Sequence, residues 1–119
     1  MTEAPDENWI AEQIYDCFAD DGTASEIRVA LGVPWQVLGG TEWRCPVLVD
    51  AFGRRQVQQV AGEGSLQALG LALSTLTLLI ARLPSEPGYT VTLYEQENLL
   101  LGLPKFRYPP SVATPNVQE

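Results

Sequence analysis

Side chains that could act as nucleophiles or general bases are few in this chain of 119 residues. The chain has no histidine, which is the commonest general base and the commonest metal ligand. Ser65 therefore lacks an activating histidine, and we interpret it as the N-cap of a helix. Asp16, Asp50 and Glu63 could supply an acid and base pair, but they lie on separate predicted elements, and solvated surface acids are far commoner. We predict that the protein is not an enzyme.

Metal and redox chemistry have equally little support in the sequence. Cys17 and Cys45 are too few for a disulfide framework and are not spaced as a zinc knuckle, so we expect reduced, buried thiols. Asp20-Asp21-Gly22 resembles the start of a calcium loop, but Leu31 stands where the closing carboxylate would be needed. A plain turn explains these three residues better. We predict no metal and no cofactor.

Acidic side chains are concentrated at the N-terminal end of the chain. The net charge is -8, and the acidic residues among the first 26 are Glu3, Asp6, Glu7, Glu12, Asp16, Asp20, Asp21 and Glu26, with no Lys or Arg between them. A localised anionic surface steers the encounter with a basic protein and repels nucleic acid. The predicted contact residues are Glu12, Asp16, Asp20, Asp21 and Glu26. The alternative is that these charges only keep the protein soluble.

Turn residues and alternating apolar residues divide the chain into short elements. We expect an acidic leader over residues 1–8, a single domain over 9–104 and a proline-containing tail over 105–119. Residues 9–18 fit a helical stripe or a strand, and the turn at Asp20-Asp21-Gly22 favours a strand in a hairpin. Further strands are predicted at residues 27–33, 43–52, 55–61 and 89–94.

One long helix is predicted at residues 66–83, ended by Pro84. Its expected core stripe consists of Leu66, Leu69, Leu73, Leu76, Ile80 and Leu83. Residues 65–81 carry no charge, but this run is shorter than the roughly 20 apolar residues that span a bilayer, so we expect a buried helix and no membrane contact. The fold class is predicted as α+β, with an antiparallel meander of about four to five strands and one long helix packed across one face.

Leu71 and Leu78 project from the helix on the side opposite to that stripe. Two leucines one heptad apart indicate either a second layer of protein or a dimer contact. The C-terminal tail could cover them, and a homodimer is the other possibility that we keep.

Two motifs resemble a family of small bacterial domains of unknown function. A strand containing Trp43-Arg44-Cys45-Pro46 is followed by a helix that begins Gly64-Ser65-Leu66-Gln67-Ala68-Leu69, as in the family's Trp-x-Cys-Pro strand and Asp-Ser-Leu-Gln-Ala-Leu helix. Gly64 stands in place of the family's usual Asp. The resemblance covers roughly residues 27–103 and implies a meander with one helix, but it implies no activity. At the level of the fold it extends to immunity proteins for secreted toxins.

Charge and missing catalytic residues together favour a binding role. The leading hypothesis is a non-catalytic cytoplasmic protein that neutralises a basic bacterial toxin through an acidic surface, as an immunity protein does. The alternative is a self-associating or regulatory domain that uses the outer helix face with Leu71 and Leu78.

Overall fold

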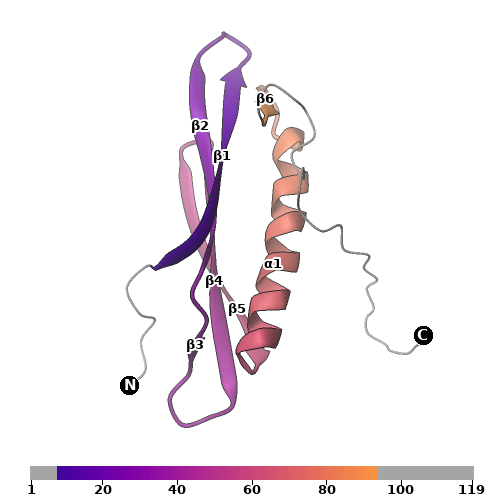
Figure 1. The fold of residues 1–119 in the computed structure, drawn as a ribbon. Coiled ribbons are helices and arrows are strands. Elements are labelled where there is room, and N and C mark those ends of the chain that lie inside the picture. Colours follow the sequence, from indigo (N-terminus) through magenta and orange to yellow (C-terminus); the bar gives the residue numbers. More distant parts are fainter. Residues whose placement is uncertain (1–7, 94–119) are drawn as a thin grey trace, which may run out of the picture.

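The computed structural model describes residues 8–93, which form one antiparallel sheet and one long helix lying along it (Figure 1). This arrangement confirms the predicted α+β class. The predicted leader up to residue 7, the tail at 105–119 and the domain's last part lie outside the described residues. The elements in chain order are β1 (Trp9–Ala19), β2 (Ala24–Gly32), β3 (Trp35–Gln36), β4 (Glu42–Ala51), β5 (Arg54–Glu63), α1 (Ser65–Arg82), a 3-10 turn (Leu83–Ser85) and β6 (Tyr89–Thr92).

Strands β1, β2, β4 and β5 form a meander in which each strand pairs with the next one in this series. Helix α1 then carries the chain back so that β6 pairs with β1 and forms the opposite edge. The two-residue strand β3 was not predicted from the sequence. It pairs with the start of β4, beside the stretch of β4 that pairs with β2. Pro46 lies between these two pairings, where its missing amide hydrogen costs no ladder bond.

Tight turns set the register of the two long hairpins. Residues 9–18 are a strand, because β1 and β2 pair antiparallel around the predicted turn, where Gly22 has a φ of 89°. The β4–β5 hairpin closes through Phe52 and Gly53, with φ values of 55° and 78°. Two successive positive φ angles define a type I′ turn, whose twist matches that of the flanking strands.

The two faces of the sheet carry different side chains because successive residues in a strand point to opposite sides. The face under α1 holds the core. Its fully buried side chains include Tyr15, Cys17, Ile27, Val29, Cys45 and Val47. We call the opposite side the open face, since no described helix covers it (Figure 1).

Helix α1 begins differently from the prediction. Gly64, with a φ of 99°, is the N-cap, and Ser65 is the first helical residue, so the predicted capping role of Ser65 is wrong. No side chain caps the helix from the N-cap position. Instead, the Gln67 side chain reaches back, and its Oε1 accepts a 2.6 Å hydrogen bond from the backbone amide of Glu63.

The buried side of the helix differs from the predicted leucine stripe in its first turns. Leu66 is 81% exposed, whereas Ala68 and Ala72 are fully buried. A Cβ atom built on Gly62 of β5 would lie 2.6 Å from the backbone nitrogen of Ala68. Small residues on both elements therefore allow α1 to approach the sheet closely, while Leu76, Ile80 and Leu83 continue the buried side as predicted.

Candidate binding surface on the open face of the sheet

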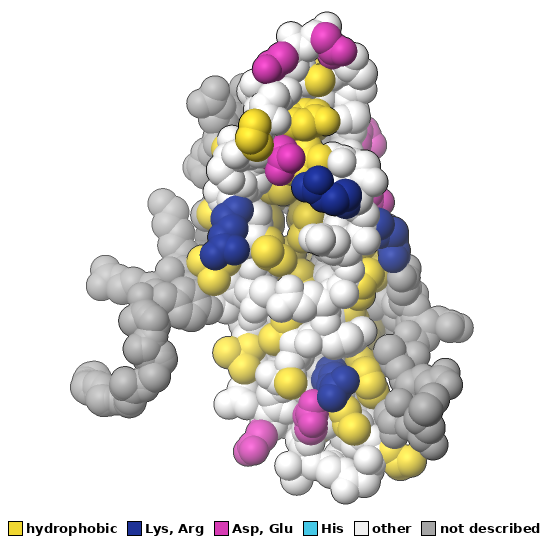
Figure 2. All heavy atoms as spheres, turned by 180° about the vertical axis from the view of Figure 1, so that it is seen from behind, with side chains coloured by type: hydrophobic (Ala, Val, Ile, Leu, Met, Phe, Trp, Pro, Cys, Tyr) yellow, Lys and Arg dark blue, Asp and Glu magenta, His cyan; other side chains and the backbone are white. Residues whose placement is uncertain are grey.

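The open face combines exposed apolar side chains with charged ones. Figure 2 views the molecule from behind Figure 1, with the helix again beside the sheet, and it shows acidic side chains at the upper end, where the β1–β2 hairpin lies. The strand registers place alternate residues of β1, β2, β4 and β5 on this side. Those of β1 are Ile10, Glu12, Ile14, Asp16 and Phe18.

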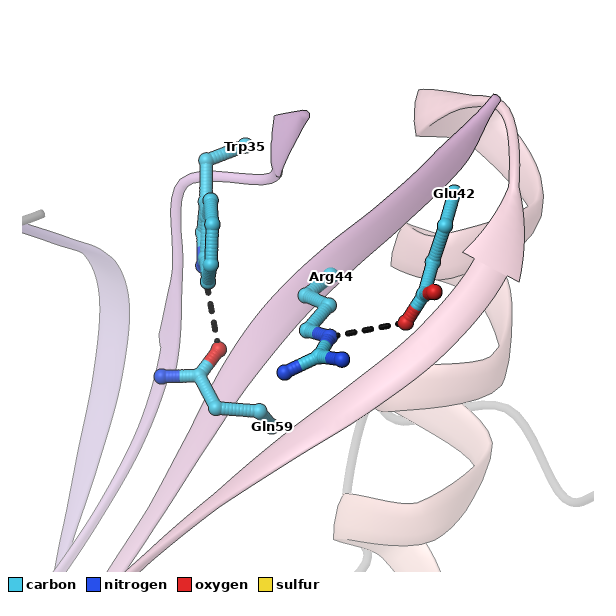
Figure 3. Close-up of polar contacts among 4 residues, drawn as sticks. All are labelled: Trp35, Glu42, Arg44 and Gln59. Carbon is cyan, nitrogen blue, oxygen red and sulfur yellow. Dashed lines mark hydrogen bonds and ion pairs between the residues drawn. The ribbon is translucent and has the colours of Figure 1, made fainter. Parts of the chain in front are cut away.

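Ion pairs and one hydrogen bond neutralise the middle and lower parts of this face. Glu12 forms an ion pair with Arg28 on the neighbouring strand. Arg44 Nε donates to Glu42 Oε2 at 2.8 Å, as Figure 3 shows. Among the predicted contact residues, Glu12 is thus already paired within the protein.

In the lower part of the open face, the side chains of Trp35 and Gln59 form a hydrogen bond across strand β4. Trp35 Nε1 donates to Gln59 Oε1 at 3.1 Å, linking the short strand β3 to the edge strand β5 (Figure 3). This contact satisfies the indole N–H, which is the only polar group of the Trp35 side chain, and one acceptor site of the Gln59 amide oxygen.

The hairpin end of the face differs because its carboxylates are not neutralised. Asp16 on β1 and Glu26 on β2 are directly opposite each other in the register. Like charges in such a pair destabilise a sheet. The structure of residues 8–93 shows no ion pair or hydrogen bond for either carboxylate. We call this group the acidic end, and it consists of Asp16, Asp20, Asp21 and Glu26.

The turn holds one of these acids in place. The backbone amide of Thr23 donates to Asp21 Oδ1 at 2.9 Å. This bond, followed by one from the Thr23 hydroxyl, lowers the pKa of Asp21 below its ordinary value. The backbone amide of Asp20 donates at 2.9 Å to the carbonyl of Gly88, just before β6. The turn is therefore fixed at both acids, while their carboxylates stay at the surface.

Apolar side chains lie directly beside the acidic end. Phe18 and Ile14 flank Asp16 on β1 and are 43% and 38% exposed. The spacing of Ile14 and Phe18 in a strand puts them on one face, but the sequence alone does not show whether that face is covered or open. Aromatic side chains are enriched in protein interfaces, so the exposed ring of Phe18 is a candidate anchor.

Leu71 and Leu78 lie away from the acidic end, on helix α1. They are 43% and 42% exposed, so the described structure does not bury them in the core. The predicted contact residues thus separate into two places. The acids gather on the hairpin, and the two leucines lie on the other layer of the molecule.

Two small clefts flank the helix, and neither contains a catalytic arrangement. One, of about 140 Å³, lies near the end of the β4–β5 hairpin and is lined by Arg54, Gln56 and Arg82 among others. The other, of about 170 Å³, lies between α1 and strands β1 and β2 and is mainly apolar. Within residues 8–93, no three or more acidic or cysteine side chains come together as a metal site would require.

The two buried thiols are in environments that give them low reactivity as nucleophiles. Burial raises the pKa of Cys45 to about 11, and its Sγ donates to the carbonyl of Gly32 at 3.3 Å. A protonated, fully enclosed thiol is a poor nucleophile. Cys17 is buried on the same side of the sheet and is also free, as predicted.

One sheet with a helix on one face and an open, partly charged second face defines a small α+β domain. Residues 13–104 match the domain of unknown function DUF6968, and the chain belongs to this family. Membership in a family of unknown function is what the sequence motifs led us to expect. No curated protein and no solved structure gives a significant match.

Proposed function

We propose that this protein binds a basic protein partner through the acidic end of the β1–β2 hairpin. The observation that carries the proposal is the pairing of Asp16 with Glu26, directly opposite each other and without a neutralising cation among residues 8–93. A sheet gains nothing from such a pair. A basic side chain from a partner would remove the repulsion and gain two charge-assisted contacts.

The surroundings of the pair support a protein as the ligand. Phe18 and Ile14 add exposed apolar surface, which gives an interface affinity, whereas the carboxylates give it speed and selectivity. A phosphate-bearing ligand would be repelled, so we expect no nucleic acid partner.

The partner that we propose is a bacterial toxin, and the protein would act in the cytoplasm as the immunity protein that neutralises it. Occlusion of a basic enzyme needs a rigid acidic surface and no catalytic residue of its own. The absence of histidine from the chain fits a non-catalytic role.

The apolar composition of helix α1 raises the question of whether the protein acts at a membrane. The stretch Ser65–Ser85 is long and apolar enough to cross a membrane by length and composition alone. It lies along the sheet, however, and contributes Ala68, Ala72, Leu76 and Ile80 to the core. We propose that it is a core helix and that the protein acts without a membrane.

The test is to produce the protein encoded by the neighbouring reading frame and to measure its association with this chain at two salt concentrations. We expect Asp20→Lys with Asp21→Lys to slow association and to reduce its dependence on salt, because exposed charges act through a field screened over about 8 to 10 Å. The matched control is Glu86→Lys, which reverses an acid outside the hairpin that pairs with Arg54. Equal rates for the double reversal and the unaltered protein would contradict the proposal.

A second test addresses neutralisation itself. If the protein is an immunity protein, its expression should restore growth to a bacterial host that produces the toxin, and Asp16→Lys with Glu26→Lys should abolish this protection. Circular dichroism should show that the variant remains folded. Full protection by the variant would leave the acidic end as a solubility feature.

The second candidate function is self-association or regulation through the outer helix face. The exposure of Leu71 and Leu78 favours it.

A further inference from the structure

The outer side of helix α1 carries two buried polar side chains. Ser74 and Thr77 are each only 5% exposed. Successive helical residues are turned by about 100°, so Ser74, which is two residues from both Ala72 and Leu76 of the core, projects almost directly away from the sheet. Thr77 is turned from this direction toward Leu73, which lines the cleft beside β1 and β2.

The helix itself does not bury these two side chains. Gly70 lies one turn before Ser74 on this side and Ala81 lies one heptad after it, and both are exposed. The burial is therefore local to the middle of the helix and requires a separate cover. Within residues 8–93, α1 packs mainly against β2, β4 and β5 on the sheet side and against the 3-10 turn that follows it. None of these elements lies over the outer side at Ser74.

We propose that residues 94–104 of this chain cross the middle of α1 and cover Ser74 and Thr77. The segment follows directly on Leu93, which is 3% exposed, so the last described residue still belongs to the core. The match to the family DUF6968 covers residues 13–104, which makes the segment part of the domain. Its sequence supplies an apolar run for such a contact, with Leu99, Leu100, Leu101 and Leu103.

The direction of β6 leads the chain toward the middle of the helix. β6 runs antiparallel to β1 with Thr92 opposite Asp16, so the chain beyond it heads toward the start of β1. There, Ala11 lines an apolar cleft with Leu73 of α1. From Asp16 to Ala11 is about 17 Å of strand, whereas residues 94–104 span up to about 36 Å when extended. The segment is therefore long enough to reach this level and to cross the helix.

Composition favours this segment over the N-terminal end of the chain. Residues 1–7 include Glu3, Asp6 and Glu7, and burial of carboxylates against a helix costs free energy, whereas burial of leucine is favourable. The helix can accept an apolar cover at Thr77, because Thr77 Oγ1 already donates to the carbonyl of Ser74 at 2.8 Å. A leucine-rich segment thus suits this place and an acidic one does not.

The proposed cover leaves both candidate binding surfaces available. On a helical projection, Leu71 and Leu78 lie on the far side of Ser74 from Thr77. Their exposed fractions of 43% and 42% are those of side chains that the cover does not enclose. The acidic end lies on the β1–β2 hairpin, so binding there does not depend on the cover.

Thiol labelling of the full chain at pH 8 tests the cover. Ser74→Cys places a thiol of similar size under it, and Ala81→Cys is the matched control on the same side of α1. The native thiols of Cys17 and Cys45 are buried and report whether the sheet stays folded. We expect the thiol at position 74 to react at least about tenfold more slowly than the thiol at position 81, since a covered thiol reacts only during local opening.

Substitutions in the segment then identify it as the cover. Leu101→Lys with Leu103→Lys should raise the labelling rate at position 74 to that at position 81, while Cys45 stays unlabelled. If this variant unfolds, as labelling of Cys45 would show, the milder Leu101→Ala with Leu103→Ala should raise the rate at position 74 alone. Removal of residues 1–7 should change neither rate.

Two results would overturn the proposal. One is equal labelling at positions 74 and 81 in the otherwise unaltered chain. The other is protection at position 74 that both pairs of leucine substitutions leave intact. Protection that is lost when residues 1–7 are removed would assign the cover to that end, and protection that depends on protein concentration would assign it to a second copy. None of these results would bear on the acidic end.

Discussion

The repulsion between Asp16 and Glu26 predicts that Asp16→Asn makes the protein more stable. Side chains directly opposite in an antiparallel pair have Cβ atoms about 5 Å apart. The carboxylates lie beyond the Cβ atoms, so two charges at about 5 Å, which repel by about 0.8 kcal/mol in water, set an upper bound, and physiological salt screens roughly half of it. Asp16→Asn should therefore raise the free energy of unfolding by about 0.4 kcal/mol, and Asp16→Lys by about twice as much.

Asp50 provides the control, because it lies on the same face between two cations. Its register partners are Arg28 on β2 and Arg55 on β5. Asp50→Asn should lower the free energy of unfolding by about 0.4 to 0.8 kcal/mol, so the same chemical change has opposite effects at the two positions. Both effects should grow at low ionic strength.

Urea unfolding followed by circular dichroism measures both variants at two salt concentrations. For a slope near 1 to 3 kcal/mol per molar, the midpoints should separate by a few tenths of a molar unit in opposite directions. The reasoning is refuted if both variants are destabilised, or if the effect of Asp16→Asn does not depend on salt. If Asp16→Asn also weakens partner binding, the hairpin would keep a costly charge pair for its function.

Three further measurements address the core. Gly62→Ala should destabilise by about 1 to 3 kcal/mol in urea melts, because the added methyl group would meet the backbone of Ala68 at 2.6 Å. Cys45 should remain unmodified by a thiol reagent in the native protein at pH 8 and react only after unfolding, since burial raises its pKa to about 11. Burial raises the pKa of Tyr15 to about 12, so absorbance should show its ionisation above the ordinary value of 10.0. Stability from this phenol should be complete below pH 10 and be lost between pH 10 and 12, because the unfolded state ionises first.

Local patterns were sufficient to predict most of the elements. The alternation in β2 and β4, and the turns at Gly22 and Gly53, depend on a few neighbouring residues each, so a strand or turn can be predicted from them. The place of β6 beside β1 depends on a return across the whole sheet, which no local pattern encodes. The pair of residues in β3 was too short to give a pattern.

The buried side of helix α1 was mispredicted in its first turns for a physical reason. Apolar residues occur on every side of this helix, so periodicity in leucine alone cannot identify the side that is buried. Close approach to Gly62 decides it, and that approach selects the small side chains of Ala68 and Ala72 in place of Leu66. The relevant signal in the sequence was a glycine late in one strand followed by alanines at a helical spacing.

The acidic contact residues were predicted by composition, but their arrangement needed the strand register. Only the turn at residues 20–23 puts Asp16 opposite Glu26, and a shift of one residue would move one of them to the covered face. Glu12 forms an ion pair with Arg28, its diagonal neighbour in this register, and is therefore a weaker candidate than the other acids.

The two candidate surfaces lie on different elements, which leads to a last prediction. The acidic end belongs to the β1–β2 hairpin, and the outer helix face with Leu71 and Leu78 belongs to α1. Binding at one surface should therefore leave the other free. A monomeric variant such as Leu71→Lys with Leu78→Lys should still bind one partner per chain with an unchanged association rate in solution.

Binding to immobilised partner should distinguish a dimer of this protein from its monomeric variant by their dissociation rates. A dimer presents two acidic ends and can rebind, so its apparent dissociation should be slower than that of the monomeric variant. Calorimetry for the stoichiometry and surface binding for the dissociation rate separate the two contributions. A monomeric variant that fails to bind in solution would show that the two surfaces are coupled, because the acidic end alone would then be insufficient for recognition.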